Sequence, residues 1–161
     1  MTTGLGEALA YTGPAITELM AVMGSVLGIY KVASVGLTSI SEDPRLFSRV
    51  MPLALLPATQ AMVYGFVFMF LSYNTLNIKV ASEGSIEIFR GIGFLTLCLF
   101  VGFAEFWSAL KQGQVCADGA AMLVKTGGKI FAPTFILATF EELFGVLGLV
   151  FGLLMSGLIL G

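Results

Sequence analysis

The stretch Ile130–Leu160 reads IFAPTFILATFEELFGVLGLVFGLLMSGLIL and decides the fold. Its 31 residues exceed the ~20 that an α-helix needs to cross the hydrocarbon core of a bilayer. Its only charged residues are Glu141 and Glu142, which lie near its middle. A carboxylate at that depth is costly, and the usual reason for keeping one is that it binds, passes or pairs with a cation. The stretch therefore predicts a transmembrane helix in which Glu142 handles an ion.

The composition of the whole chain also indicates a membrane protein. Hydrophobic residues make up 57% of it and charged residues only 11%, whereas roughly a quarter of the residues in a soluble domain are charged. The net charge is −2 and there is no His, so the chain lacks the basic surface that a nucleic acid would require. We therefore expect lipid, and no nucleic acid, among its partners.

Four long apolar segments follow one another, and we expect each to be a transmembrane helix. They are Ala8–Leu37, Val50–Ile78, Ile88–Cys116 and Ile130–Leu160. A helix satisfies its own backbone hydrogen bonds, which lipid cannot do, and the alternating pattern of a β-barrel is not seen. The sequence thus predicts an all-α integral membrane fold of two tandem hairpins. Residues 1–78 form the first hairpin, and residues 79–161 form the second, which carries the ion-binding glutamate.

Polar connectors separate the segments at residues 41–45, 79–87 and 125–129. The basic residues near the first and third connectors are Arg45, Arg49, Lys111, Lys125 and Lys129. The second connector has Lys79 and Arg90, which are offset by Glu83 and Glu87. Since Lys and Arg favour the cytoplasmic side of a membrane, we expect the first and third connectors in the cytoplasm. Both termini of this multi-pass cell-membrane protein are then outside.

The two halves of the chain are similar enough to suggest a duplication. Ser25, Leu27, Val32 and Gly36 recur 83 residues later as Ser108, Leu110, Val115 and Gly119. Gln60 lies 82 residues before Glu142, so parallel repeats would place these two polar side chains at a similar depth. The chain also has 20 Gly, many of them in the first and third segments. Such glycines favour close helix packing, either within one subunit or in the inner layer of a ring.

Polar side chains recur at membrane depth in three of the segments. They are Thr59, Gln60 and Tyr64, just after Pro57; Glu105, Ser108 and Gln112; and Thr134, Thr139, Glu141 and Glu142. Hydroxyl, amide and carboxylate oxygens together suit a hard cation, and one negative charge balances one positive charge. The alternative is a network of hydrogen bonds that only holds the helices together. A buried carboxylate is a costly member of such a network, which favours the ion site.

Three motifs resemble one family of membrane proteins. The run Leu55-Leu56-Pro57-Ala58-Thr59-Gln60, followed by Tyr64-Gly65-Phe66, resembles the second helix of the membrane-rotor proteolipid (of the K, or c, type) of bacterial V/A-type ATPases. The runs Glu142–Gly148 and Lys111–Val115 are similar to the ion-carrying helix and to the third helix of that family. The resemblance implies an ion-translocating, non-catalytic subunit of a homo-oligomeric rotor ring. No phosphate-binding Gly-x-x-x-x-Gly-Lys-Ser/Thr motif occurs, in keeping with that role.

The resemblance also implies a ligand set and a gate. The matching ligands are Glu142, Gln112, Gln60, Thr59 and the backbone carbonyl of Leu56, holding Na⁺ or, as the alternative, H⁺. Tyr64 matches the tyrosine that closes the site in sodium-carrying members. It follows Gln60 by four residues instead of the usual three, and one extra residue turns a helical side chain by about 100° unless a bulge compensates.

The implied partners are further copies of the chain, a static membrane subunit with a basic residue, and central-stalk subunits on the cytoplasmic side. A different class of function stays open: a small four-helix transporter that exchanges protons for cations or drugs through Glu18. The sequence assigns no role to Glu18, Glu105 or Glu141. For Glu105 and Glu18 it leaves two options, exposure to the interior of a ring or protonation.

Overall fold

The computed structural model describes residues 2–161 of the chain. Its α-helices are α1 (Thr2–Glu42), α2 (Phe47–Leu55), α3 (Phe66–Glu83), α4 (Ile88–Ala121) and α5 (Phe131–Leu160). Short 3₁₀ turns, η1 (Pro44–Leu46) and η2 (Leu56–Ala58), flank α2, and a π-helix, η3 (Gln60–Gly65), precedes α3. The described residues contain no strand.

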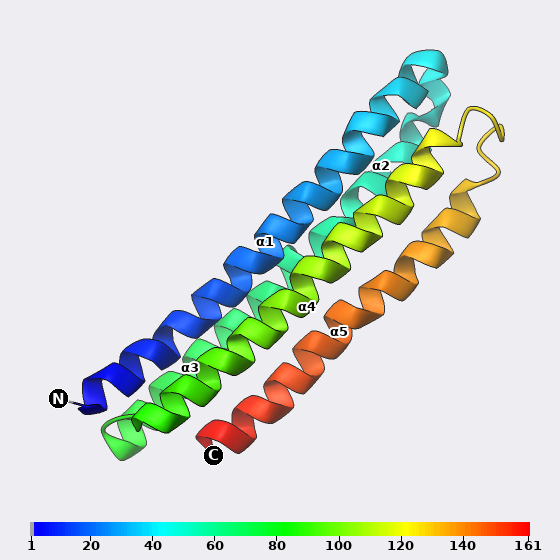
Figure 1. Ribbon diagram of the computed structural model, residues 1–161. Helices are drawn as coiled ribbons and strands as arrows, with labels where there is room; N and C mark the ends of the chain where they lie inside the picture. Colours follow the sequence, from blue (N-terminus) through cyan, green and yellow to red (C-terminus); the bar gives the residue numbers. More distant parts are fainter. Residues whose placement is uncertain (1) are drawn as a thin grey trace.

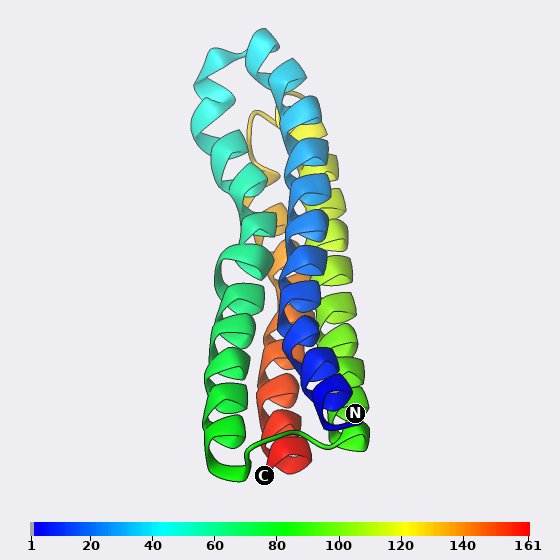
Figure 2. The same cartoon turned by 90° about the vertical axis from the view of Figure 1, so that its left-hand side faces the viewer.

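Four helical segments are long and apolar enough to cross a membrane, which confirms the expected all-α fold. They are Gly4–Glu42, Pro44–Glu83, Ile88–Ala121 and Phe131–Leu160, so η1, α2, η2, η3 and α3 together make one span. The spans lie lengthwise in one elongated bundle (Figure 1). Both termini and the α3–α4 connection are at one end, and the α1–α2 and α4–α5 connections are at the other (Figures 1 and 2).

The first two connections are shorter than the sequence predicts, for local reasons. Between α1 and η1 only Asp43 is non-helical; its carboxylate accepts a hydrogen bond from the backbone N–H of Arg45 at 3.0 Å. The Arg45 side chain also donates to this carboxylate, which lowers the pKa of Asp43. Helix α3 continues to Glu83, since Lys79 and Glu83 pair one turn apart at 2.6 Å. Gly84, with φ 78°, then ends the helix.

Helices α1 and α4 are packed backbone against backbone. A Cβ built on Gly113 would lie 2.7 Å from the carbonyl oxygen of Gly28, so only glycine allows this approach. Hydroxyls join the same two helices: Thr17 Oγ1 donates to the carbonyl of Cys98 at 2.7 Å, and Ser39 Oγ to that of Ala120 at 2.8 Å. The glycines of these segments therefore act in helix packing within one subunit.

Candidate ion-binding site

The second span is interrupted where the polar residues of the site lie. The sequence predicts one helix over Val50–Ile78, but the structure has the 3₁₀ turn η2 and then the π-helix η3. Pro57 has no backbone N–H for the helical ladder, and its ring disfavours regular α-helix before it. The backbone N–H of Thr59 instead donates to the carbonyl of Leu56. This break precedes a π-helix that contains both Gln60 and Tyr64.

The π-helix compensates for the spacing between Gln60 and Tyr64. A π-helix takes more residues per turn than an α-helix, so it absorbs one extra residue without turning the side chains that follow. Tyr64 accordingly points to α5, where its hydroxyl donates a hydrogen bond to Oε1 of Glu142 at 2.8 Å. The bulge that the four-residue spacing would require is therefore present, and the 100° misdirection does not occur.

Both carboxylate oxygens of Glu142 are engaged from different parts of the chain. Tyr64 donates to Oε1, and Gln112 Nε2 donates to Oε2 at 3.4 Å. Gln112 is fully buried on α4 and also donates to the carbonyl of Ala138 on α5 at 3.2 Å. The glutamate of α5 is thus held between η3 on one side and α4 on the other.

Gln60 connects the remaining predicted ligands to this pair. It is fully buried, and its Nε2 donates to Oε1 of Gln112 at 3.3 Å. The hydroxyl of Thr59 lies 3.2 Å from Oε1 of Gln60 and 2.9 Å from the carbonyl oxygen of Leu56. The structure therefore joins all six residues named from the sequence in one continuous network. In order of contact they are Leu56, Thr59, Gln60, Gln112, Glu142 and Tyr64.

The oxygens of this network are of the kind that hard cations prefer. It contains one carboxylate, two side-chain amides, a hydroxyl and a backbone carbonyl, which supply several oxygens and a single negative charge. A side-chain amide presents its oxygen in place of its nitrogen after a half-turn. Gln60 and Gln112 can thus serve as ligands with little movement of the helices that carry them.

Ser108 belongs to the same network but was not among the predicted ligands. Its Oγ accepts a hydrogen bond from Gln60 Nε2 at 3.0 Å and donates to the backbone carbonyl of Glu141 at 2.7 Å. It lies four residues before Gln112, so the two side chains share a face of α4. This spacing is the signal that could have found it.

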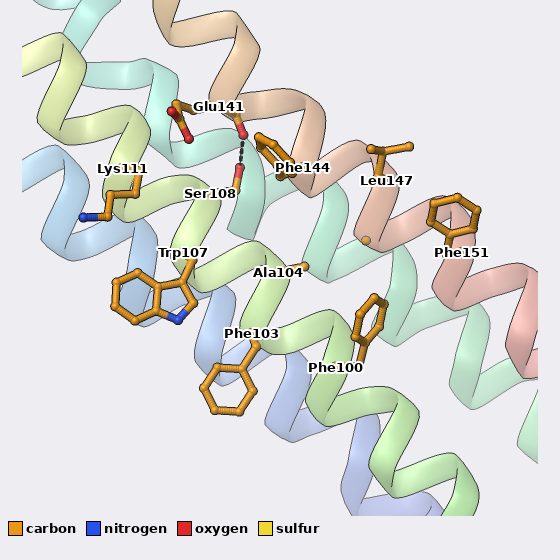
Figure 3. A pocket seen from close by; sticks show the side chains of 11 residues that line it. Phe100, Phe103, Ala104, Trp107, Ser108, Lys111, Glu141, Phe144, Leu147 and Phe151 are labelled. Carbon is orange, nitrogen blue, oxygen red and sulfur yellow. Dashed lines mark hydrogen bonds between the residues drawn. The ribbon is translucent and has the colours of Figure 1, made fainter.

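The carboxylate of Glu141 lies apart from that of Glu142, as expected for adjacent helical residues. It lines a pocket between α4 and α5 whose walls are mostly apolar, with Trp107, Phe144 and Phe151 among them (Figure 3). Lys111 lies at the same pocket, and its Nζ is 5.7 Å from the centre of the Trp107 ring. Only the backbone of Glu141 reaches the network, through Ser108 (Figure 3).

Two further acids lie at membrane depth, one buried and one half-buried. Glu105 is fully buried within the subunit, so the idea that it faces the interior of a ring is wrong. Glu18 is half-buried on α1, close to Gly65 of the π-helix, since a Cβ built on Gly65 would lie 2.5 Å from Oε2 of Glu18. Neither acid takes part in the hydrogen bonds of the network described above.

The comparisons with known proteins agree with this arrangement. A family model described as the C subunit of ATP synthase matches residues 12–72 and again residues 95–155. The K subunit of the V-type sodium ATPase of Enterococcus hirae is 29% identical over 160 residues, which cover 96% of this chain and 94% of that protein. Proteins of this family form membrane rings in rotary ATPases, which leaves no support for the small transporter considered from the sequence. The chain belongs to the family of ATP synthase C subunits, as a proteolipid of the c or K type.

Proposed function

We propose that this rotor proteolipid carries sodium ions through the membrane sector of a V/A-type ATPase, with Glu142 as the carrier. The observation that carries the proposal is the pair of hydrogen bonds on Glu142, from Tyr64 at 2.8 Å and from Gln112 at 3.4 Å. They hold both oxygens of one intramembrane carboxylate in a fixed orientation. Tyr64 is the gate that closes the site after an ion has entered.

The number of oxygens favours sodium over a proton. A proton needs one carboxyl group and one acceptor, whereas a metal ion needs several oxygens around it. Here Gln112, Gln60, Thr59 and the carbonyl of Leu56 extend from Glu142 in one connected set. The printed name of the Enterococcus hirae relative, which describes a sodium ATPase, supports the same choice.

The working cycle follows from the cost of charge in lipid. Bare Glu142 would be expensive to expose to hydrocarbon, but with a bound cation its charge is balanced and the ring can turn. A basic residue on a static membrane subunit then displaces the ion into an exit channel. Central-stalk subunits on the cytoplasmic side transmit rotation from the soluble sector, so the chain itself is non-catalytic. Gln60 occupies in the first hairpin the place of Glu142 in the second, which leaves one ion per four helices.

Labelling of Glu142 with dicyclohexylcarbodiimide tests the proposal, because this apolar reagent modifies protonated carboxyl groups in lipid. We expect wild-type rings to be labelled at Glu142, and we expect increasing sodium at fixed, mildly alkaline pH to protect it. Glu142→Gln should abolish labelling, while Glu141→Gln, the matched control at the adjacent residue, should not. Labelling that is unaffected by sodium at any concentration would make the chain a proton carrier.

A further inference from the structure

Glu105 is a buried acid that the ion-binding network does not use. Its side chain is 0% exposed. Among residues 2–161, neither of its carboxylate oxygens has a hydrogen-bond partner. An isolated ionised carboxylate in an apolar interior is among the most costly groups to bury, so its charge must be neutralised.

The carboxyl group fits against a glycine face of α5. A Cβ built on Gly145 would lie 2.8 Å from Oε2 of Glu105, and one built on Gly148 would lie 3.3 Å from Oε1. Two glycines one turn apart therefore make the room that the Glu105 carboxyl occupies. The backbone N–H groups of this turn are committed to the helical hydrogen bonds of α5, so they do not solvate the carboxyl.

Within residues 2–161, the elements packed around Glu105 carry further acids but no basic side chain that pairs with it. Oε2 of Glu18 on α1 lies beside Gly65 of η3, and the ring of Tyr64 on η3 lies beside Gly145, against which Glu105 also packs. The third neighbouring element, α5, contributes Glu142, to which Tyr64 is hydrogen-bonded. The ion pairs found in the described part of the chain involve Asp43 and Glu83, which are far along the sequence from this place. No basic side chain in that part therefore balances Glu105.

A proton suits this position better than a metal ion. Oγ of Ser108, which also lies beside Gly145, already donates to the carbonyl of Glu141 and accepts from Gln60. The other atoms found beside Gly145 and Gly148 are carbons of Tyr64 and Ala104 and the carbonyl oxygen of Val101, which is 4.0 Å from a Cβ built on Gly148, so few oxygens lie there for a metal ion. Nor do the described residues hold any group of three His, Cys, Asp or Glu side chains able to bind a metal.

We propose that Glu105 is a proton-binding site of each subunit, separate from the ion carrier Glu142. The chain then holds a resident proton in its interior, at a carboxyl that stays neutral while Glu142 exchanges its own ion. Tyr64 lies near both sites: its hydroxyl donates to Glu142, and its ring edge lies beside Gly145, against which Glu105 packs. Neutral Glu105 leaves Glu142 as the negative charge that a transported cation meets.

Infrared spectroscopy of purified rings tests this proton-binding site, since a protonated carboxylic acid has a carbonyl stretching band that an ionised carboxylate lacks. The measurement uses Glu142→Gln rings at neutral pH, so the result does not depend on which ion Glu142 carries. We expect Glu142→Gln rings to show an acid band. Adding Glu105→Gln should reduce the intensity of this band by the amount of one carboxyl group per subunit. Adding Glu141→Gln, the control at a half-buried acid on α5, should leave the band unchanged.

Equal acid bands with and without Glu105→Gln would overturn the proton-binding site, and so would the absence of any acid band in Glu142→Gln rings. If the double variant does not assemble, Glu105→Asp replaces it. The shorter side chain keeps the acid in an altered environment, so its band should move in frequency, and an unmoved band would also overturn the proposal. The two tests are independent. A negative infrared result does not affect sodium protection of Glu142, and a lack of sodium protection does not affect the acid band.

Discussion

The hydroxyl of Tyr64 lies 2.8 Å from Oε1 of Glu142, although 78 residues separate them in the chain. The π-helix Gln60–Gly65 makes this contact possible, because it directs the tyrosine of the second span to the fourth. Removing the hydroxyl with Tyr64→Phe should weaken sodium protection of Glu142. A hydrogen bond to a charged group contributes about 1.5–3 kcal/mol, so the half-protecting sodium concentration should rise roughly 10- to 160-fold.

The control for Tyr64→Phe is Tyr30→Phe, at a tyrosine that is 69% exposed on α1. This variant also removes a tyrosine hydroxyl, but at a position far from Glu142, and it should leave the sodium titration unchanged. If Tyr64→Phe rings are protected as well as wild-type rings, Tyr64 does not act as the gate.

Gln112→Ala should also weaken protection, because it removes both an oxygen ligand and a donor to Glu142. The lost group is buried, and the expected cost is about 1–3 kcal/mol of binding free energy, which the same labelling titration measures. Gln114→Ala is the matched control: this glutamine is exposed on the same helix and bonds to Asp118. Equal shifts for the two variants would contradict a specific role for Gln112. Thr59→Ala should act in the same direction, since it removes the hydroxyl between Leu56 and Gln60.

Deleting Met62 tests what the π-helix does. Met62 is 74% exposed and contributes one residue to Gln60–Gly65, so its removal gives Tyr64 the three-residue spacing that α-helix geometry accommodates. We expect the deletion variant to keep sodium protection of Glu142, because the direction of Tyr64 is preserved. Inserting one Ala after Met62 should abolish protection by turning Tyr64 about 100° away. Loss of protection in the deletion variant would mean that the bulge itself is needed for exchange.

Gly113→Ala should destabilise the subunit, because its Cβ would meet the backbone of Gly28 on α1. Overpacking of this kind costs about 1–3 kcal/mol and should lower the temperature at which rings dissociate. Gly93→Ala is the control on the same helix, where the nearest atom to an added Cβ is 3.6 Å away on Ile159. Alanine favours helix more than glycine does, so this variant should be at least as stable as wild type. A Gly113→Ala ring as stable as the Gly93→Ala ring would contradict close packing of α1 on α4.

The orientation in the membrane can be tested with two matched serines. Ser41 and Ser82 are both exposed near helix ends, at opposite ends of the bundle, and each bonds to the carbonyl three residues before it. Cys98 and Cys116 are buried, so background reaction with thiol reagents should be low. A membrane-impermeant maleimide added to intact cells should label Ser82→Cys and spare Ser41→Cys. The reverse pattern would place both termini in the cytoplasm.

Much of the fold could be predicted from the sequence, because lipid allows few alternatives. A run such as Ile130–Leu160 has to satisfy its backbone hydrogen bonds internally, so its length and apolar character alone predict a spanning helix. The ends of the helices were less predictable. Helix α3 extends to Glu83 through its pairing with Lys79, and hydropathy takes no account of such side-chain contacts. The duplication likewise needed only the order of residues, and the family model matches the two halves separately.

The residues of the polar network could also be named from residue types and motifs, whereas the geometry of the network could not. Whether Tyr64 reaches Glu142 depends on how the backbone after Pro57 responds to the missing N–H, and that response is fixed only when α4 and α5 pack against it. Ser108 joined the network for the same reason. From the sequence Glu105 could face the interior of a ring or be protonated, and only the packing of α5 glycines against it shows that it lies inside the subunit. The sequence by itself determines where helices form in lipid because backbone hydrogen bonding is local, but which polar atoms meet depends on contacts between distant segments.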